Sequence, residues 1–360
     1  MIESKPFGHT KSGEECRLFY LYNHQGHSVC ITDFGARIVE INVPDSLGKI
    51  ENVVLAYDRL EAYENDPAYL GAIVGRYASR IHEGKFEMDG KTIQLSKNEK
   101  GNHLHGGANG FDKKVWNSKT ESSKGYERLT LSCFSPDGEE GYPGNLEVSL
   151  KYTWNHESEL SLDFSAKSDQ KTIINLTSHS YFNLSGFAKV EILDHLLMIN
   201  SKSFAPMKAE LVPQGTLEEV SETPFDFSCF KAIGKAIENQ DPQLKLAGGY
   251  DHSFFLQAGN SLIKAVSLYE PKSKRLLEIS TTEVAAHLYS GNYLPNVLGR
   301  NGMTIGPKKG VALEMQHFGD SPNQPAFPST ILEANTEFKS STLYKFTTVE
   351  SIVNQINSNL

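Results

Sequence analysis

Strict alternation of apolar and polar residues is the feature of this sequence that most restricts its fold. In the segment LEVSLKYTW the apolar side chains are Leu146, Val148, Leu150, Tyr152 and Trp154, and those between them are polar. The segments LSLDFSA and LTLSC repeat the pattern. A period of two places every apolar side chain on one face of a β-strand. The sequence therefore predicts many strands, each with one face on a core.

Turn and helix signals complete the prediction of fold class. Asp89 and Gly90 lie between two short runs in FEMDGKTIQL, which predicts a two-residue hairpin turn. Only DRLEAYE and FKAIGKAIE have helical spacing, the latter with Phe230, Ile233 and Ile237 on one face. We therefore predict an all-β fold, a large antiparallel β-sandwich with a few short helices, as a single domain over residues 1–360.

The net charge and the distribution of apolar residues argue against several classes of protein. The formal net charge of −9 argues against a nucleic-acid partner, which needs a basic surface. No apolar run reaches the roughly 18 residues of a membrane span, and the first residues lack the apolar core of a signal peptide, so we expect a cytoplasmic protein without a membrane partner. The four cysteines are scattered, which predicts reduced thiols rather than a disulfide framework or a zinc site.

A glutamate stands out in the segment GVALEMQHF. Period two places Val311, Leu313 and Met315 on one face of a strand and Glu314 on the other. A carboxylate in so apolar a strand is poorly solvated, which favours its use as a general base. A buried glutamate paired with an arginine is the alternative.

A histidine lies among hydrogen-bonding residues in the segment INLTSHSYFNLSG. The same periodicity groups Asn175, Thr177, His179 and Tyr181 on one face. Such neighbours can fix the tautomer of His179, as a histidine that acts as a general acid requires. The alternative is a histidine with a purely structural role.

The segment NHLHGG places His103 and His105 on the same side of a predicted strand. This spacing can begin a metal site, but a metal ion needs further ligands, and the nearby carboxylate of Asp112 lies in a predicted turn. We therefore expect no metal. The glycines that follow allow the backbone to approach a ligand closely.

Two further segments carry groups suited to binding hydroxyl oxygens. Arg76 and Arg80 are flanked by small residues that leave room for a ligand, and arginine offers several fixed donors. Asp251 lies between a glycine turn and aromatic residues in GGYDHSFF. Ion pairs at the edge of the core and ordinary turn chemistry are the alternatives for these residues.

The order of these segments resembles the aldose 1-epimerase (galactose mutarotase) family. The resemblance runs over nearly the whole chain, through GRYASRI, NHLHGGANGFDKKVW, NLTSHSYFNLSG, LVPQGTLEEV, TPFDF, GYDHSFF, LYSGNYL and GVALEMQHFGDSPNQP. It implies a galactose mutarotase-like supersandwich with its site on a concave face. It also implies an isomerase that interconverts the α and β anomers of free aldohexoses such as glucose and galactose, with no cofactor.

The resemblance implies a role for each matching residue. Glu314 matches the general base that takes the proton from the anomeric hydroxyl, and His179 matches the general acid that protonates the ring oxygen. His105 matches a second histidine that assists at the ring oxygen or binds the sugar. Arg80 and Asp251 match residues that hold sugar hydroxyls.

Three other positions belong to the implied binding site. Tyr181 lies in the same segment as the general acid. Ser79 stands in ASRI where many relatives have ANRI, and His287 stands in HLYSGN where many have QFYTGN. Neither departure touches the acid–base pair, but both bear on which sugar is preferred.

Three other functions compete with this one. A glycosidase would use Asp251 and Glu314 as its two carboxylates. A carbohydrate-binding module would use the aromatic residues and Asp251 without the acid–base pair. An epimerase of hexose 6-phosphates would need a basic pocket, for which the candidates are Arg76, Arg80 and Arg300. Strand periodicity does not distinguish a monomer from a homodimer.

Overall fold

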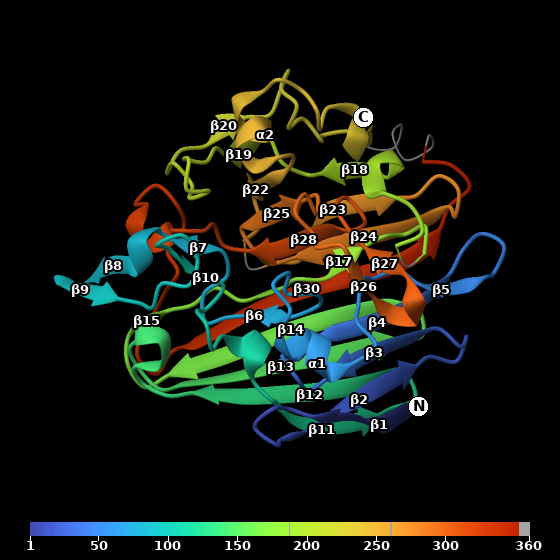
Figure 1. The fold of residues 1–360 in the computed structure, drawn as a ribbon, viewed down its shortest axis with the longest axis horizontal. Helices are drawn as coiled ribbons and strands as arrows, with labels where there is room; N and C mark the ends of the chain where they lie inside the picture. The colour runs from blue at the N-terminus through green and yellow to red at the C-terminus, as the bar shows by residue number, and fades with distance from the viewer. Residues whose placement is uncertain (187, 260, 353–360) are drawn as a thin grey trace.

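The structure, a computed structural model, describes residues 1–186, 188–259 and 261–352. It is built mostly of β-strands with a few short helices, so the predicted fold class is confirmed (Figure 1). The extent of the single domain stays a prediction.

The longest strands form a nine-stranded antiparallel sheet. Within it the apolar residues predicted in LEVSLKYTW are all buried, which confirms the alternation. The last strand among the described residues, β30, lies inside this sheet with β14 and β24 as its neighbours (Figure 1). The order across the sheet is β11 (Asn117–Ser122), β12 (Tyr126–Ser135), β13 (Leu146–Asn155), β14 (Glu159–Ser168), β30 (Glu337–Thr348), β24 (Arg275–Thr281), β23 (Ile263–Tyr269), β18 (Leu196–Ile199) and β21 (Lys231–Ala232).

Two smaller antiparallel sheets pack with the large one. A single buried cluster contains Leu150 of the nine-stranded sheet, Leu313 of a six-stranded sheet and Ile31 of a five-stranded sheet, so one core joins the three. The order in the six-stranded sheet is β17 (Tyr181–Phe182), β28 (Val311–Gln316), β25 (Ala285–Tyr289), β22 (Asp251–Phe255), β19 (Ser203–Ala205) and β20 (Glu218–Glu219). The five-stranded sheet follows chain order as β1 (Ile2–His9), β2 (Glu15–Tyr22), β3 (Ser28–Thr32), β4 (Ile38–Pro44) and β5 (Ile50–Asn52).

Short two-stranded pairs fill the loops between these sheets. The hairpin predicted at Asp89 and Gly90 is confirmed, with φ of 52° and 73° at the two turn residues, as a type I′ turn requires. The pairs are β6 (Ile73–Val74) with β16 (Thr177–Ser178), β7 (Arg80–Ile81) with β10 (His103–Leu104), β8 (Lys85–Met88) with β9 (Lys91–Gln94), β15 (Thr172–Ile173) with β29 (Ile331–Leu332), and β26 (Val297–Leu298) with β27 (Thr304–Ile305).

One of the two predicted helices is confirmed and the other is wrong. The segment DRLEAYE contains α1 (Leu60–Glu64). The segment FKAIGKAIE instead contributes β21, which pairs with β18, and then a single 3-10 turn. Strand pairing at the sheet edge outweighs a weak helical pattern that Gly234 interrupts. The 3-10 turns are His82–Gly84, Phe111–Lys113, Glu139–Gly141, Ile192–Asp194, Ile233–Lys235, Arg300–Gly302 and Ser321–Asn323.

Helix α2 (Pro242–Ala247) was not predicted, although its end signals are present. The Asp241 side chain accepts a hydrogen bond from the backbone N–H of Gln243, proline occupies the first turn, and Gly248 closes the helix at φ 69°. In the part of the chain that the structure describes, no helix has the length and apolar character needed to cross a bilayer.

Candidate active site

Strand β28 presents two different faces. Val311, Leu313 and Met315 enter the core, while Glu314 points to the opposite side, as the alternation predicted. Glu314 is nevertheless only 2% exposed. Its cross-strand neighbour in β25 is His287, whose own neighbour in β22 is Ser253. The six-stranded sheet thus carries a row of polar side chains on the face away from the core.

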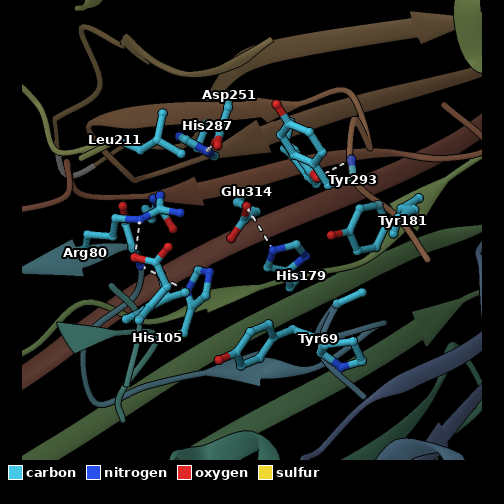
Figure 2. Close-up of a pocket in the computed structure, with 18 of the residues that line it drawn as sticks. Tyr69, Arg80, His105, His179, Tyr181, Leu211, Asp251, His287, Tyr293 and Glu314 are labelled. Carbon is cyan, nitrogen blue, oxygen red and sulfur yellow. Dashed lines mark hydrogen bonds and ion pairs between the residues drawn. The ribbon is translucent and has the colours of Figure 1, made fainter. Parts of the chain in front are cut away.

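A pocket with a volume of about 390 Å³ opens on this face (Figure 2). Its size and mixture of polar and aromatic walls suit a small-molecule ligand. The structure brings all the predicted site residues to its wall, although their roles stay predictions. These residues are Ser79, Arg80, His105, His179, Tyr181, Asp251, His287 and Glu314.

Glu314 and His179 face each other in the pocket (Figure 2). The Glu314 Oε1 lies 3.5 Å from the His179 Nε2. Among the described residues, no arginine pairs with Glu314, so the alternative of a structural Glu–Arg pair fails. The second carboxylate oxygen of Glu314 and the Nδ1 of His179 are buried and have no hydrogen-bond partner among the described protein groups. Both side chains therefore retain free bonding capacity next to one another.

The prediction that His179 shares one strand face with Asn175, Thr177 and Tyr181 is wrong for the first two residues, while Tyr181 does lie beside His179. Two separate strands, β16 and β17, flank His179 and pair with different partners. Asn175 bonds the carbonyl oxygens of Ala78 and His317, while Thr177 donates to the carbonyl oxygen of Met315. The hydrogen bonds of these side chains connect neighbouring backbone segments and do not orient the His179 ring.

Aromatic rings hold His179 instead. The Tyr181 ring lies 4.9 Å from the imidazole between centroids, and the Tyr69 ring lies nearly parallel to it at 6.1 Å. His105 meets the imidazole edge-on at 5.4 Å. Packing of rings on several sides restricts the orientation of the imidazole without occupying its nitrogens.

His105 is fixed by the backbone of Ser79. Its Nδ1 accepts a hydrogen bond from the Ser79 N–H at 3.1 Å, and its own backbone N–H donates to the Ser79 carbonyl oxygen. Burial, together with the nearby His179 and Arg80, lowers the pKa of His105 well below its usual value. A neutral ring whose Nδ1 accepts must carry its proton on Nε2, so His105 is a hydrogen-bond donor toward the pocket.

Asp251, His287 and Ser253 form a chain of hydrogen bonds. The His287 Nε2 lies 2.8 Å from an Asp251 oxygen, and its Nδ1 lies 2.9 Å from the Ser253 hydroxyl. Burial opposes charge on His287, but the hydrogen bond and charge of Asp251 raise its pKa. The same bond outweighs burial and lowers the pKa of Asp251. Both ring nitrogens of His287 are thus engaged, and the residue holds Asp251 in place.

Arg80 and Ser79 form another wall of the pocket. The Arg80 Nε bonds the Glu99 carboxylate at 3.2 Å, which orients the guanidinium. Ser79 has a φ of 67°, in the left-handed region that asparagine enters more readily than serine does. The asparagine implied by the resemblance would therefore suit this backbone as well as a ligand.

Other residues weighed from the sequence lie elsewhere. The Arg76 guanidinium is buried against Ser135 and the carbonyl oxygens of Pro136 and Pro143, so it is structural. Arg300 pairs with Glu40, so these two arginines do not join Arg80 in a basic pocket.

His103 and His105 do not form a common metal-binding site, because both ring nitrogens of His103 bond other protein groups. Its Nε2 bonds the Tyr142 hydroxyl at 2.6 Å and its Nδ1 bonds the Ser96 carbonyl oxygen, while the strand ends at Leu104. Within the described ranges, no three histidine, cysteine or acidic side chains are arranged to hold a metal ion.

Sequence reasoning missed several pocket residues. Tyr289 and Gln316 lie two positions after His287 and Glu314, so the period of two could have identified them. Tyr69, Glu99 and Tyr293 come from loops, where no periodicity indicates direction.

Comparisons with known proteins agree with this geometry. The family model for aldose 1-epimerase matches residues 17–345. Galactose mutarotase from Homo sapiens is 38% identical over 319 residues, which cover 88% of this chain and 90% of that protein. Aldose 1-epimerase from Escherichia coli K12 is 34% identical over 337 residues, which cover 93% and 96% of the two chains.

Solved structures agree as well. The crystal structure of galactose 1-epimerase from Lactobacillus acidophilus matches with a TM-score of 0.85 at 29% identity, over 97% of this chain and 99% of that one. These similarities confirm the resemblance seen in the sequence and identify an isomerase with a small-molecule sugar substrate. The chain belongs to the aldose 1-epimerase family.

Proposed function

We propose that this protein interconverts the α and β anomers of free aldohexoses such as glucose and galactose, with Glu314 as general base and His179 as general acid. The observation that carries the proposal is the carboxylate and imidazole 3.5 Å apart in a pocket of sugar size. The name of the human relative, galactose mutarotase, supports galactose as the first sugar to test.

The proposed chemistry needs two proton transfers at atoms bonded to one carbon. Glu314 takes the proton of the anomeric hydroxyl while protonated His179 gives a proton to the ring oxygen, so the C1–O5 bond breaks and an aldehyde forms. Each positioned proton-transfer group contributes about 10²–10⁴-fold to the rate. Rotation about C1–C2 turns the other face of the carbonyl toward the O5 hydroxyl. Ring closure then reverses both transfers.

The remaining groups bind the sugar in this proposal. His105, with its proton on Nε2, donates to the ring oxygen or a neighbouring hydroxyl. Arg80 and Asp251 bind hydroxyl oxygens, each oriented by a fixed partner, Glu99 and His287. Tyr181 supplies an apolar wall beside His179. His287 and Ser79 are proposed to influence which sugar fits.

The central test replaces Glu314 by glutamine. Because the amide keeps the shape but takes no proton, we expect the variant to lose at least 10²-fold in kcat while sugar binding is largely kept. Polarimetry of freshly dissolved α-galactose and α-glucose measures the rate. His179→Asn is expected to lose most of kcat in the same assay, and replacement of the exposed His24 by asparagine serves as the matched control.

The results separate the possible roles. A near-normal rate in the Glu314 variant would remove that residue from the mechanism, and full activity in the His179 variant would reassign the acid to His105. Steady release of aglycone from aryl glycosides would favour a glycosidase, and activity on hexose 6-phosphates alone would favour a phosphosugar epimerase. Sugar binding without any mutarotation would indicate a binding module.

The proposal includes the cellular setting. We expect a cytoplasmic enzyme without nucleic-acid or membrane partners, in line with its net charge of −9. It acts as a monomer or a homodimer, which light scattering during size-exclusion chromatography distinguishes. Initial rates across fresh α-aldopyranoses, including xylose and arabinose, rank the substrates.

A further inference from the structure

Gln316 lines the pocket but has no role in the proposed acid–base chemistry. It is also not among the residues proposed above to bind sugar hydroxyls. It follows Glu314 by two positions on β28, so its side chain emerges on the same pocket face, about 6.7 Å further along the strand. Its cross-strand neighbour is Ala285, whose methyl group offers no hydrogen bond. The Gln316 side chain is fully buried all the same.

Both ends of the Gln316 amide are unpaired. Neither Oε1 nor Nε2 has a hydrogen-bond partner among the described protein groups. Buried amide groups in native proteins are nearly always paired, because an unpaired one costs about 1–3 kcal/mol. An unpaired amide at this position therefore needs an explanation. A bound ligand that forms hydrogen bonds with both amide atoms provides one.

The pattern of unpaired atoms within the pocket supports this reason. Of the described residues that line it, those with buried, unpaired side-chain atoms are Glu314, His179 and Gln316. The first two are the groups proposed to exchange protons with the sugar. Gln316 also has buried, unpaired side-chain atoms and lines the same pocket. Because an amide neither gives nor takes a proton at neutral pH, its contribution is binding.

We propose that Gln316 binds a ring hydroxyl of the sugar through both amide atoms and thereby helps to determine which aldose is preferred. This rests on the proposed function. A hydroxyl group donates one hydrogen bond and accepts others, which complements an amide that presents one acceptor and one donor side by side. Because Gln316 lies one strand repeat from Glu314, the hydroxyl is on a ring carbon away from C1.

The test is Gln316→Met, which keeps the side-chain volume and removes both hydrogen-bonding atoms. Initial rates are measured by polarimetry with galactose, glucose and their singly deoxygenated derivatives. We expect kcat/KM to fall about 10-fold with the parent sugar, as for the loss of one or two hydrogen bonds. With the one deoxy sugar that lacks the contacted hydroxyl, wild type and variant should react equally, because that contact is already missing.

Two further variants complete the design. Ser267→Ala is the matched control, because the Ser267 hydroxyl is also buried and unpaired but lies in β23, away from the pocket. It should leave every rate unchanged. Gln316→Asn draws the amide back by one methylene group and should lose the same discrimination, so the test does not depend on the methionine variant alone.

Each outcome has a definite meaning. An equal fall with every sugar would overturn the proposal and assign Gln316 to holding Glu314, and unchanged rates would exclude a contact of any kind. Both results leave the proposed function standing. A wild-type protein without mutarotase activity would overturn the proposed function itself, and this inference with it.

Discussion

At the scale of single residues, the pair Asp251–His287 connects the site to pH. Because His287 has a raised pKa, its contribution to stability is full below the unfolded-state value of about 6.5 and disappears as the pH rises through the folded-state pKa. Asp251 has a lowered pKa, so its contribution is full above about 3.9 and is lost as the pH falls through its folded-state value. The pair is therefore strongest between about pH 4 and 6.5.

Replacing His287 by glutamine tests this dependence. We expect the free energy of unfolding to fall by about 2 kcal/mol at pH 5.5, as for a hydrogen bond between charged groups, and by less at pH 9. Urea denaturation of both proteins at several pH values measures the difference. A difference that stays constant from pH 5.5 to pH 9 would contradict an ionic pair.

The sequence allowed the site residues to be predicted better than their contacts. Motif matches located Glu314 and His179, and the structure brings them together. The partners of Asn175, such as the carbonyl oxygen of His317, come from distant parts of the chain, and no local pattern encodes them. The hydrogen bond by which His287 orients Asp251 likewise joins residues that are 36 positions apart in the sequence.

At the scale of elements, the loop after β10 carries His105 and is held by one carboxylate. Glu140 accepts hydrogen bonds from the backbone N–H of Ala108 at 3.2 Å, from the backbone and side chain of Asn109 at 2.8 Å, and from the Ser96 hydroxyl. These bonds fix the turn that follows His105. The chemistry of the pocket thus depends on a residue outside it.

Glu140→Ala should loosen this loop. We expect the free energy of unfolding to fall by about 2 kcal/mol and KM for the sugar to rise, because His105 is no longer held against Ser79. Chemical denaturation and polarimetric kinetics measure the two effects, and Glu140→Gln, which keeps part of the bonding, should be milder. An alanine variant with unchanged KM would show that the loop positions itself without Glu140.

Long strands were predicted from the sequence more reliably than short elements. The alternation in β13 and β14 runs for ten residues each, so a single neighbour cannot obscure it. Strands β16 and β17 have two residues each, and their direction is set by the different partners that they meet. Periodicity needs length, and much of the pocket is built from segments that are too short to show it.

At the scale of the whole molecule, the sheet that supports the site depends on its central strand. β30 bonds β14 on one side and β24 on the other. Leu343→Pro within β30 should cost about 3 kcal/mol or more, because Leu343 is paired with Ser161 of β14 and Ser280 of β24, and proline removes a backbone donor from a strand with two neighbours. The matched change Thr120→Pro in the edge strand β11, which pairs with β12 alone, should cost much less, because the Thr120 N–H points away from β12. Thermal and urea denaturation compare the two variants, and equal losses would contradict the ranking.

The position of β30 also has a consequence for biosynthesis. The ribosome synthesises β11–β14, and then β18, β21, β23 and β24, before β30. Two partial sheets with open edges therefore exist until the strand that joins them is made. Nascent chains of this protein are thus expected to remain vulnerable to aggregation until β30 has been synthesised, and to benefit from chaperones that shield exposed strand edges during that delay.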